Sequence, residues 1–246
     1  MALEVKDKKD KIILKGVVKY VYKNMGKAIL QYSMLEKNDK ILVGVSGGVD
    51  SLSLLKLFTM RRKRVPIKFD FIACLVMADF IKVNSTVIVN FCRENDIPLV
   101  IKRVTFNDND INCFWCSWNR RKIIFETAKE YGCNKIALGH NLDDITETIL
   151  MNLFFFGEIS AMKPKISLFN GRLMIIRPLT YITKDVLYSF AKKINIPFTD
   201  YKCLYGEGSR RELVKGIIKT VEKDCPAVKK NIFNALRKVK NNYLLT

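Results

Sequence analysis

The segment Ile41–Ser51 constrains the fold of this chain more than any other part, and it reads Ile-Leu-Val-Gly-Val-Ser-Gly-Gly-Val-Asp-Ser. An apolar run typical of a buried strand stops at a Ser-Gly-Gly turn, and an apolar-faced helix pattern opens at Leu52. This order of strand, glycine turn and helix N-terminus points several backbone N–H groups at one place, at the positive end of the helix dipole. The segment therefore predicts an anion-binding turn.

The residue types in this turn indicate a nucleotide. Gly47 and Gly48 allow a ligand to approach the backbone closely. Ser46 and Ser51 add hydroxyl donors, and Asp50 can hold a metal ion that neutralises phosphate. The spacing excludes a Walker A loop and a dinucleotide fingerprint, because no Gly-Lys-Ser/Thr and no third glycine follow where those motifs need them. We expect a pyrophosphate site, with an ordinary strand-to-helix turn as the alternative.

Further strand and helix patterns alternate along the chain, which predicts the α/β class. Strand patterns cover Phe69–Val76, Leu99–Val104, Lys135–Gly139 and Leu173–Arg177, and helix patterns cover Thr86–Asn95, Arg120–Tyr131, Asp143–Phe155 and Lys184–Ile194. Strands separated by helices imply parallel βαβ units, in which ligands bind at the carboxyl ends of the strands. The glycine turn lies at one such end, and Gly139 and His140 lie at another.

Both ends of the chain read as basic helices. Lysines four residues apart, from Lys11 to Lys27, form a ridge on an amphipathic helix that ends near Ser33. After Cys203, two helix patterns follow with no strand between them, Ser209–Lys223 and Pro226–Asn242. We predict a basic N-terminal helix over residues 1–35, a nucleotide-binding domain over 36–200, and a basic helical region over 201–246.

The charge balance predicts a nucleic acid partner. The 43 Lys and Arg residues against 24 Asp and Glu leave a net charge of +19. An ATP enzyme that acts on a small metabolite has no need of such a charge, whereas a protein that binds a phosphate backbone does. We expect Lys15, Lys19 and Lys23 to contact RNA, with a lysine-rich composition and a solvated helix face as the alternatives. The sequence shows neither an apolar signal core nor a membrane span, so we expect a cytoplasmic protein without membrane contact.

Seven cysteines, an odd number, argue against a disulfide framework. Cys113 and Cys116 form a CxxC pair, which we expect on a turn before a helix, and the spacing suits a shared metal, a cluster or a redox dithiol. Only Cys203 lies in a comparable loop, and three cysteines suit an iron–sulfur cluster with one open iron. Cys225 is an outside candidate for a fourth ligand. Cys74 and Cys92 read as structural, and Cys133 reads as a turn residue.

Charged residues flank these motifs. Asp143 and Asp144 open a helix just after Gly139 and His140, where they either complement the helix dipole or position Mg²⁺ and the nucleotide. His140 is expected near the phosphates. Arginine pairs follow the cysteine motifs at Arg120, Arg121, Arg210 and Arg211, and the fork geometry of arginine suits RNA phosphates. Solvated helix starts are the alternative.

The ordered combination of motifs resembles the tRNA 2-thiocytidine synthetase family, whose members are ATP pyrophosphatases with a PP-loop. The resemblance covers roughly residues 11–240. The motifs that carry it are Ser46–Ser51, Cys113–Cys116 followed by Arg120 and Arg121, Gly139–Thr148, Met151–Phe154, Arg177–Leu179 and Cys203. It implies a parallel sheet of the adenine nucleotide alpha hydrolase-like type, with an N-terminal helix and a small basic C-terminal helical appendage.

The resemblance also implies a mechanism and roles for individual residues. ATP with Mg²⁺ would adenylate the C2 oxygen of a tRNA pyrimidine, and sulfur would replace that oxygen. The ATP site would consist of Ser46, Gly47, Gly48, Asp50, Ser51, Gly139 and His140. The catalytic residues would be Asp50, Asp143, Asp144, Cys113 and Cys203. A [4Fe-4S] cluster would be bound by Cys113, Cys116 and Cys203. Implied partners are tRNA, a sulfide or persulfide donor such as a cysteine desulfurase, and a second copy in a homodimer.

Three departures from the family pattern leave the fold and the chemistry in place but leave the target base open. Val49 stands where many relatives have lysine, Asp200 takes the place of an additional cysteine, and the zinc ribbons of the thiouridine relatives are absent from the sequence. The alternatives are a tRNA 2-thiouridine synthetase, thiolation through a persulfide on Cys113 or Cys203 without a cluster, a lysidine-forming ligase, and a non-catalytic RNA-binding or redox-sensing protein.

Overall fold

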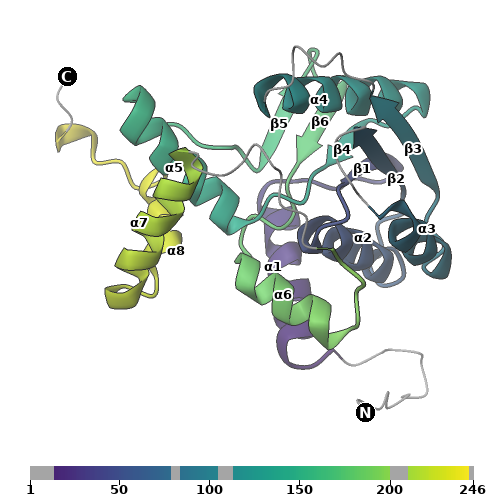
Figure 1. Ribbon diagram of the computed structural model, residues 1–246, viewed down its shortest axis with the longest axis horizontal. Coiled ribbons are helices and arrows are strands. Elements are labelled where there is room, and N and C mark those ends of the chain that lie inside the picture. The colour runs from purple at the N-terminus through teal and green to yellow at the C-terminus, as the bar shows by residue number, and fades with distance from the viewer. Residues whose placement is uncertain (1–13, 79–83, 105–112, 200–209, 244–246) are drawn as a thin grey trace.

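The computed structural model describes residues 14–78, 84–104, 113–199 and 210–243. Six strands form one sheet in the order β3-β2-β1-β4-β6-β5 (Figure 1). The strands are β1 Asp39–Val45, β2 Phe69–Ala78, β3 Leu99–Val104, β4 Lys135–Ala137, β5 Lys165–Leu168 and β6 Leu173–Ile176. All neighbouring strands run parallel except β5 and β6, which are antiparallel. The predicted α/β class with a mostly parallel sheet is confirmed.

Helices lie on both faces of the sheet and beside it. They are α1 Gly16–Gln31, α2 Val49–Arg62, α3 Ser85–Glu94, α4 Cys113–Glu130, α5 Leu142–Phe156, α6 Lys184–Lys193, α7 Arg210–Asp224 and α8 Val228–Ala235, with a short 3-10 turn Asn241–Tyr243. Figure 1 shows α1, α2, α3 and α6 on one face of the sheet and α4 on the other. In the part of the chain that is described, no helix is long and apolar enough to cross a membrane.

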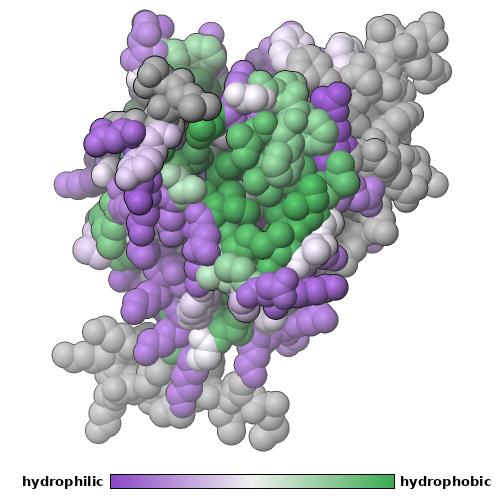
Figure 2. All heavy atoms as spheres, turned by 90° about the vertical axis from the view of Figure 1, so that its left-hand side faces the viewer, coloured by the Kyte–Doolittle hydropathy of each residue, from purple (hydrophilic) through white to green (hydrophobic). Residues whose placement is uncertain are grey.

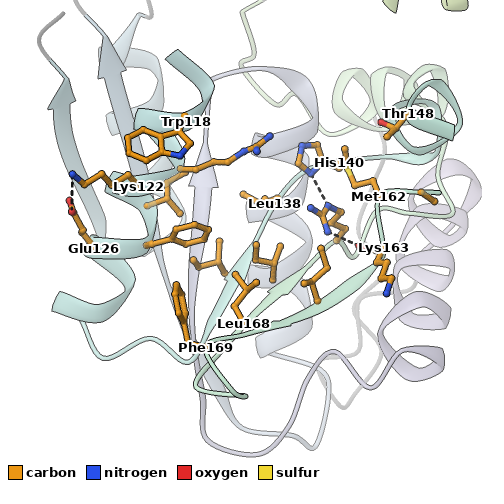
Figure 3. A pocket seen from close by; sticks show the side chains of 18 of the residues that line it. Trp118, Lys122, Glu126, Leu138, His140, Thr148, Met162, Lys163, Leu168 and Phe169 are labelled. Atoms are coloured by element: carbon orange, nitrogen blue, oxygen red, sulfur yellow. Dashed lines mark hydrogen bonds and ion pairs between the residues drawn. The ribbon is translucent and has the colours of Figure 1, made fainter. Parts of the chain in front are cut away.

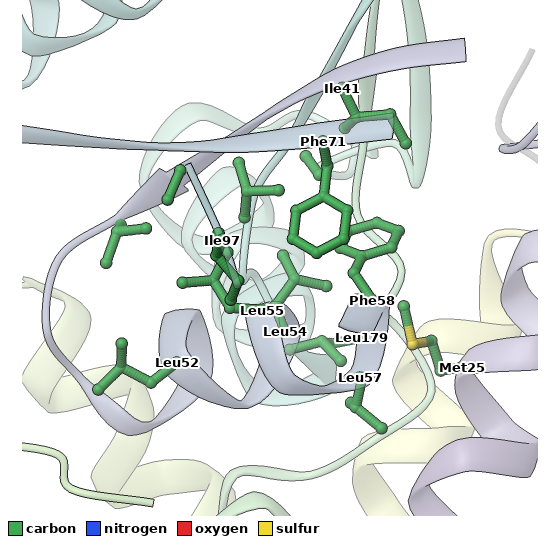
Figure 4. Packing of buried hydrophobic residues seen from close by; sticks show 14 of the residues in the cluster. Met25, Ile41, Leu52, Leu54, Leu55, Leu57, Phe58, Phe71, Ile97 and Leu179 are labelled. Atoms are coloured by element: carbon green, nitrogen blue, oxygen red, sulfur yellow. The ribbon is translucent and has the colours of Figure 1, made fainter. Parts of the chain in front are cut away.

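The main core lies between the sheet and the layer that contains α2. Leu54, Leu55 and Leu57 of α2 are completely buried, because the helix packs against the sheet on one side and against α6 on the other. Figure 4 shows these side chains with Phe58 and Phe71, whose rings are 5.6 Å apart. Each buried leucine contributes about 1.5–3 kcal/mol to folding. This core holds the N-terminus of α2, and therefore the glycine turn, in place.

The C-terminal helices pack on α5 rather than on the sheet. Val214 and Ile218 of α7 are buried against the apolar side of α5, and Phe233 of α8 packs on Leu142 and Ile149 of α5. The predicted basic helices of this region are therefore present. The second one ends at Ala235 instead of continuing to Asn242, because Val239 is exposed and packing no longer supports a helix there.

Two further predictions of secondary structure were wrong. The CxxC pair lies in the first turn of α4 and not on a turn before the helix, since no glycine or proline separates Cys113 from Arg120. Strand β5 was not predicted, because four residues after Pro164 carry little pattern and pair only with β6 at the sheet edge. The start of the lysine ridge at Lys11, the polar turn at 107–112 and the loop containing Asp200 and Cys203 lie outside the described residues.

Candidate functional site

The glycine turn joins β1 to α2 and is held by its own hydroxyl groups. Gly47 has φ +84°, a conformation that favours glycine. The backbone N–H of Ser46 donates to Ser51 Oγ at 3.2 Å, and Ser51 Oγ donates to the carbonyl of Gly48 at 3.1 Å. Gly48 is the N-cap of α2 and provides no side-chain cap. The first N–H groups of α2 therefore suit an anionic ligand.

The segment after β4 passes directly beside this turn. Strands β1 and β4 are parallel neighbours, so their carboxyl ends meet. A Cβ atom on Gly139 would lie 3.1 Å from the backbone carbon of Asp50 and from the nitrogen of Ser51. Only glycine allows the two segments to approach so closely, and together they form one wall of a pocket.

This nucleotide pocket has a volume of about 360 Å³. Its lining combines residues from five parts of the chain: Gly44, Val45, Ser46, Asp50, Ser51, Val76, Arg120, Ile124, Leu138, Gly139, His140, Asp144 and Arg211. The structure thus brings together the glycine turn, Gly139, His140, Asp144 and one arginine from each of the two predicted pairs. A pocket with backbone donors and two arginines can bind phosphate groups.

Two carboxylates face the phosphate side of the pocket. Asp50 Oδ1 is buried and has no hydrogen-bond partner within the described residues. Burial, together with the nearby Asp144 carboxylate, raises the pKa of Asp50 to about 6. No three His, Cys, Asp or Glu side chains converge as a metal site in the described chain. Two carboxylates next to a phosphate site nevertheless suit Mg²⁺, which usually takes its other ligands from substrate phosphates and water.

His140 is a hydrogen-bond donor with a defined tautomer. Its Nδ1 accepts from Arg177 Nε at 3.1 Å, and Arg177 Nη1 donates to the carbonyl of Lys163 at 2.6 Å. A guanidinium cannot accept a hydrogen bond, so the proton of the imidazole lies on Nε2. Burial lowers the pKa of His140 to about 4, which keeps the ring neutral. His140 can therefore donate to a phosphate oxygen from the pocket wall.

The two neighbouring aspartates at the start of α5 have different partners. Asp144 caps the helix with Asn141, since Asn141 N–H donates to Asp144 Oδ2 at 3.0 Å, and it also lines the pocket. Asp143 does not line the pocket. Its Oδ2 accepts from the backbone N–H of Lys184 at 2.8 Å, and its Oδ1 lies 3.0 Å from Lys229 Nζ.

The other predicted RNA-binding residues lie outside this pocket. Arg121 lines a neighbouring cavity, and Arg210 lies over the Phe155 ring at 4.9 Å. Lys15, Lys19 and Lys23 are exposed on or at the start of α1, on the sheet face opposite α4 (Figure 1). The structure does not bring these lysines to the pocket.

The cysteines fall into two groups. Cys74, Cys92 and Cys133 are buried, and burial raises the pKa of each thiol. For Cys74 and Cys92 this agrees with the predicted structural role. Cys113 and Cys116 belong to the first turn of α4, and Cys203 lies outside the described residues. Cys225 follows α7, and its Sγ lies 3.5 Å from Asn231 Nδ2.

Two residues that support the pocket were not assigned to the site from the sequence. Arg177 sets the tautomer of His140, and Glu147 of α5 lies 3.7 Å from Arg211 Nε. Burial raises the pKa of Glu147 to about 7. The only sequence signal for Glu147 was its position one helical turn after Asp143 and Asp144, on the same side of α5.

Comparison with known proteins places the chain among nucleotide-dependent RNA-modifying enzymes. The family model described as PP-loop domain matches residues 19–215. The tRNA-cytidine(32) 2-sulfurtransferase of Geobacter metallireducens is 33% identical over 231 residues, which cover 90% of each chain. The protein of the same name from Geotalea uraniireducens is 34% identical over 232 residues, covering 90% of this chain and 92% of that one.

A solved structure is also similar. The U34-tRNA thiolase NcsA from Methanococcus maripaludis, determined with its [4Fe-4S] cluster, has a TM-score of 0.74 and 26% sequence identity. The match covers 91% of this chain and 80% of that chain.

Proposed function

The chain belongs to the PP-loop family of tRNA-cytidine 2-sulfurtransferases, and on this premise we propose that it uses ATP to replace the C2 oxygen of a tRNA cytidine with sulfur. The names of the relatives specify cytidine 32, and we propose the same nucleotide here. The observation that carries the proposal is the pocket in which the glycine turn meets Gly139, His140 and Asp144.

The first chemical step is adenylation of the cytidine. The C2 oxygen attacks the α-phosphorus of ATP, a new P–O bond forms, the bond to the β-phosphate oxygen breaks, and pyrophosphate leaves. Backbone N–H groups at the start of α2 stabilise the departing pyrophosphate. Arg120, Arg211 and the Nε2 hydrogen of His140 donate to phosphate oxygens from the other walls.

The residues present fit a magnesium ion. The unpartnered Oδ1 of Asp50 and the carboxylate of Asp144 supply hard oxygen ligands beside the pyrophosphate site. When bound, Mg²⁺ would neutralise phosphate charge.

The positions of the cysteines support a [4Fe-4S] cluster held by Cys113, Cys116 and Cys203. At about 100° per residue, positions 113, 116 and 120 lie within about 60° of one another on α4, and Arg120 lines the pocket. The connection that contains Cys203 starts at Thr199, whose N–H donates to the Gly47 carbonyl at 3.2 Å, and ends at α7 beside Arg211. The described residues on either side of Cys203 thus lie at the glycine turn and at the pocket. The similar thiolase NcsA contains such a cluster.

Sulfur would enter from a sulfide or persulfide donor, such as a cysteine desulfurase. When bound, the cluster would carry the sulfur, since thiolate-bound clusters with an open iron can take an external sulfide. Attack of sulfur on the activated C2 carbon expels AMP and completes the exchange of oxygen for sulfur. The net charge of +19 supports binding of the tRNA backbone.

We also propose that the protein forms a homodimer through α5 and α7. Figure 2 shows a broad apolar area on the side of the molecule where α5, α7 and α8 lie. Its exposed apolar side chains include Leu153, Phe154 and Phe156 of α5 and Leu213, Ile217 and Val221 of α7. The three α7 residues are four apart and form one stripe. A two-fold related copy would place the same apolar helix pair against this one, as in a four-helix interface.

One experiment tests the cluster and the reaction together. Protein purified without oxygen is analysed for iron and sulfide and is assayed with tRNA, ATP and sulfide, with detection of the modified nucleoside by mass spectrometry. We expect about four irons per chain and 2-thiocytidine as the product. Cys203→Ala should lose iron and product, whereas Cys225→Ala should keep both. A colourless wild-type protein that still thiolates tRNA would refute the cluster and favour persulfide chemistry.

A further inference from the structure

A second and larger cavity adjoins the nucleotide pocket. It has a volume of about 730 Å³, within the range of roughly 300–1,000 Å³ that is usual for ligand pockets. Its floor is apolar and consists of Ile136, Leu138, Ile166 and Ile175. Helix α4 packs on one face of the sheet at β1 to β4. At β5 and β6 the same face of the sheet is open and forms part of the cavity wall (Figure 3).

The two pockets share a wall. Ile124, Leu138 and His140 line both of them. Figure 3 shows His140 at the side of the larger cavity, across from Trp118. A group bound in the larger cavity at this wall would therefore lie beside the nucleotide pocket.

The polar end of the larger cavity presents hydrogen-bond acceptors. Thr148 Oγ1 donates to the carbonyl of Asp144 at 2.8 Å. Asn152 Nδ2 donates to the carbonyl of Ser160 at 3.2 Å and to Ser160 Oγ at 2.7 Å. A carbonyl can only accept, so these bonds fix the orientation of the Asn152 amide. The hydrogens of both side chains are engaged, and their oxygens remain as acceptors for a ligand.

The opposite end of the cavity is aromatic and basic. Trp118 is 53% exposed, and Lys122 Nζ lies 5.9 Å from the centre of its ring. The rings of Phe125 and Phe169 meet edge to face at 6.3 Å. Arg121 also lines the cavity and adds positive charge, whereas Lys163 lies on the other side, with His140 and Met162 (Figure 3). Aromatic faces stack on nucleic acid bases, and cationic side chains bind the adjoining phosphates.

We propose that this cavity receives the target cytidine after its extrusion from the tRNA, with its amino group toward Thr148 and Asn152, and that Trp118 stacks on a neighbouring base. This inference rests on the proposed function and names a site for its substrate. Enzymes that modify a base commonly extrude it into a pocket. Cytosine carries an amino donor where uracil carries a carbonyl acceptor. Two acceptors in the cavity therefore favour cytosine over uracil.

The base preference is tested with two tRNA transcripts that carry cytidine or uridine at the target position. We expect the wild-type protein to prefer cytidine. The double variant Thr148→Val, Asn152→Leu keeps the side-chain sizes and removes the acceptors. Its kcat/KM for the cytidine transcript should fall by about 10-fold or more, and its kcat/KM for the uridine transcript should not fall. An unchanged preference would overturn the assignment.

The aromatic end is tested separately with a matched pair of variants. Trp118→Ala should raise the KM for tRNA by about tenfold while the KM for ATP stays constant. Tyr131→Ala is the control, because Tyr131 follows the same helix, is 44% exposed and does not line the cavity. Equal tRNA KM values for the two variants would remove Trp118 from the site. A wild-type protein that thiolates neither transcript would instead refute the proposed function, and this inference with it.

Discussion

Asp143 and Asp144 show how adjacent residues of one type can serve different purposes. Asp144 lines the nucleotide pocket and caps α5. Asp143 lies on α5 and links it to two other helices. Its carboxylate accepts a hydrogen bond from Lys184 N–H at the start of α6 and forms an ion pair with Lys229 of α8. The structure therefore supports a chemical role for Asp144 and a positioning role for Asp143.

Substitution of each aspartate separates the two roles. Asp144→Asn should lower thiolation more than 100-fold, because the pocket loses a negative charge at the place proposed for Mg²⁺ and the phosphates. Asp143→Asn should keep most of the thiolation rate but lower the free energy of unfolding by about 1–3 kcal/mol, since Lys229 loses a partially buried ion pair. Single-turnover assays and urea unfolding measure the two effects. An Asp143→Asn protein of full stability without activity would contradict this division.

At the level of the elements, the close contact between the segment after β4 and the start of α2 shapes the nucleotide pocket. Gly139→Ala would place a Cβ 3.1 Å from backbone atoms of Asp50 and Ser51, which cannot move independently of α2. We expect ATP affinity to fall by about tenfold or more, as measured by calorimetry.

A glycine in an open environment provides the control for this substitution. Gly216 lies within α7, and a Cβ there would meet no atom within 4 Å. Gly216→Ala should leave ATP affinity unchanged and stabilise the protein by about 0.5–1 kcal/mol, because alanine favours the helix. Equal ATP affinities for the two variants would show that the contact at Gly139 does not shape the pocket.

The contact between α5 and α7 depends on pH through Glu147. The folded state raises the pKa of this carboxyl from 4.5 to about 7, so between these values the folded protein holds a proton that the unfolded chain has lost. The contribution of Glu147 to the free energy of unfolding therefore falls as pH rises through this window. Glu147→Gln should be more stable than wild type at pH 8, by on the order of 2 kcal/mol, and similar at pH 5. Thermal unfolding at both pH values tests this, and parallel pH curves would refute it.

For the whole molecule, the apolar surface of α5 and α7 predicts the oligomeric state. Light scattering should give the mass of a dimer for the wild-type protein. The double variant Leu213→Glu, Ile217→Glu should be a monomer, because two charges in each stripe oppose burial. Val89→Glu on α3 is a control on another exposed apolar residue and should remain a dimer. A wild-type monomer at high concentration would exclude this interface.

Much of the fold and part of the site could be predicted because their signals are local. The alternation of β and α patterns, the glycine turn and the helix after Gly139 each depend on residues close together in sequence. Periodicity and backbone sterics act over this range, and Ser46, Asp50, Gly139 and Asp144, which these patterns singled out, line one pocket. The start of α4 was predicted at Arg120 instead of Cys113, because the local sequence contains no helix-breaking residue that marks the boundary.

The tertiary structure decided which of the remaining residues meet. Arg120 and Arg211 lie 91 positions apart and reach one pocket only because α4 packs on the sheet and α7 packs on α5. Arg177 reaches His140 because β6 pairs with β4, and the cavity beside them exists because α4 does not extend over β5 and β6. Such contacts depend on strand order and helix docking, which arise from packing across the whole chain. The sequence by itself determined the strand, the turn and the types of reactive side chain, and the packing of the chain decided which of these side chains meet in one pocket.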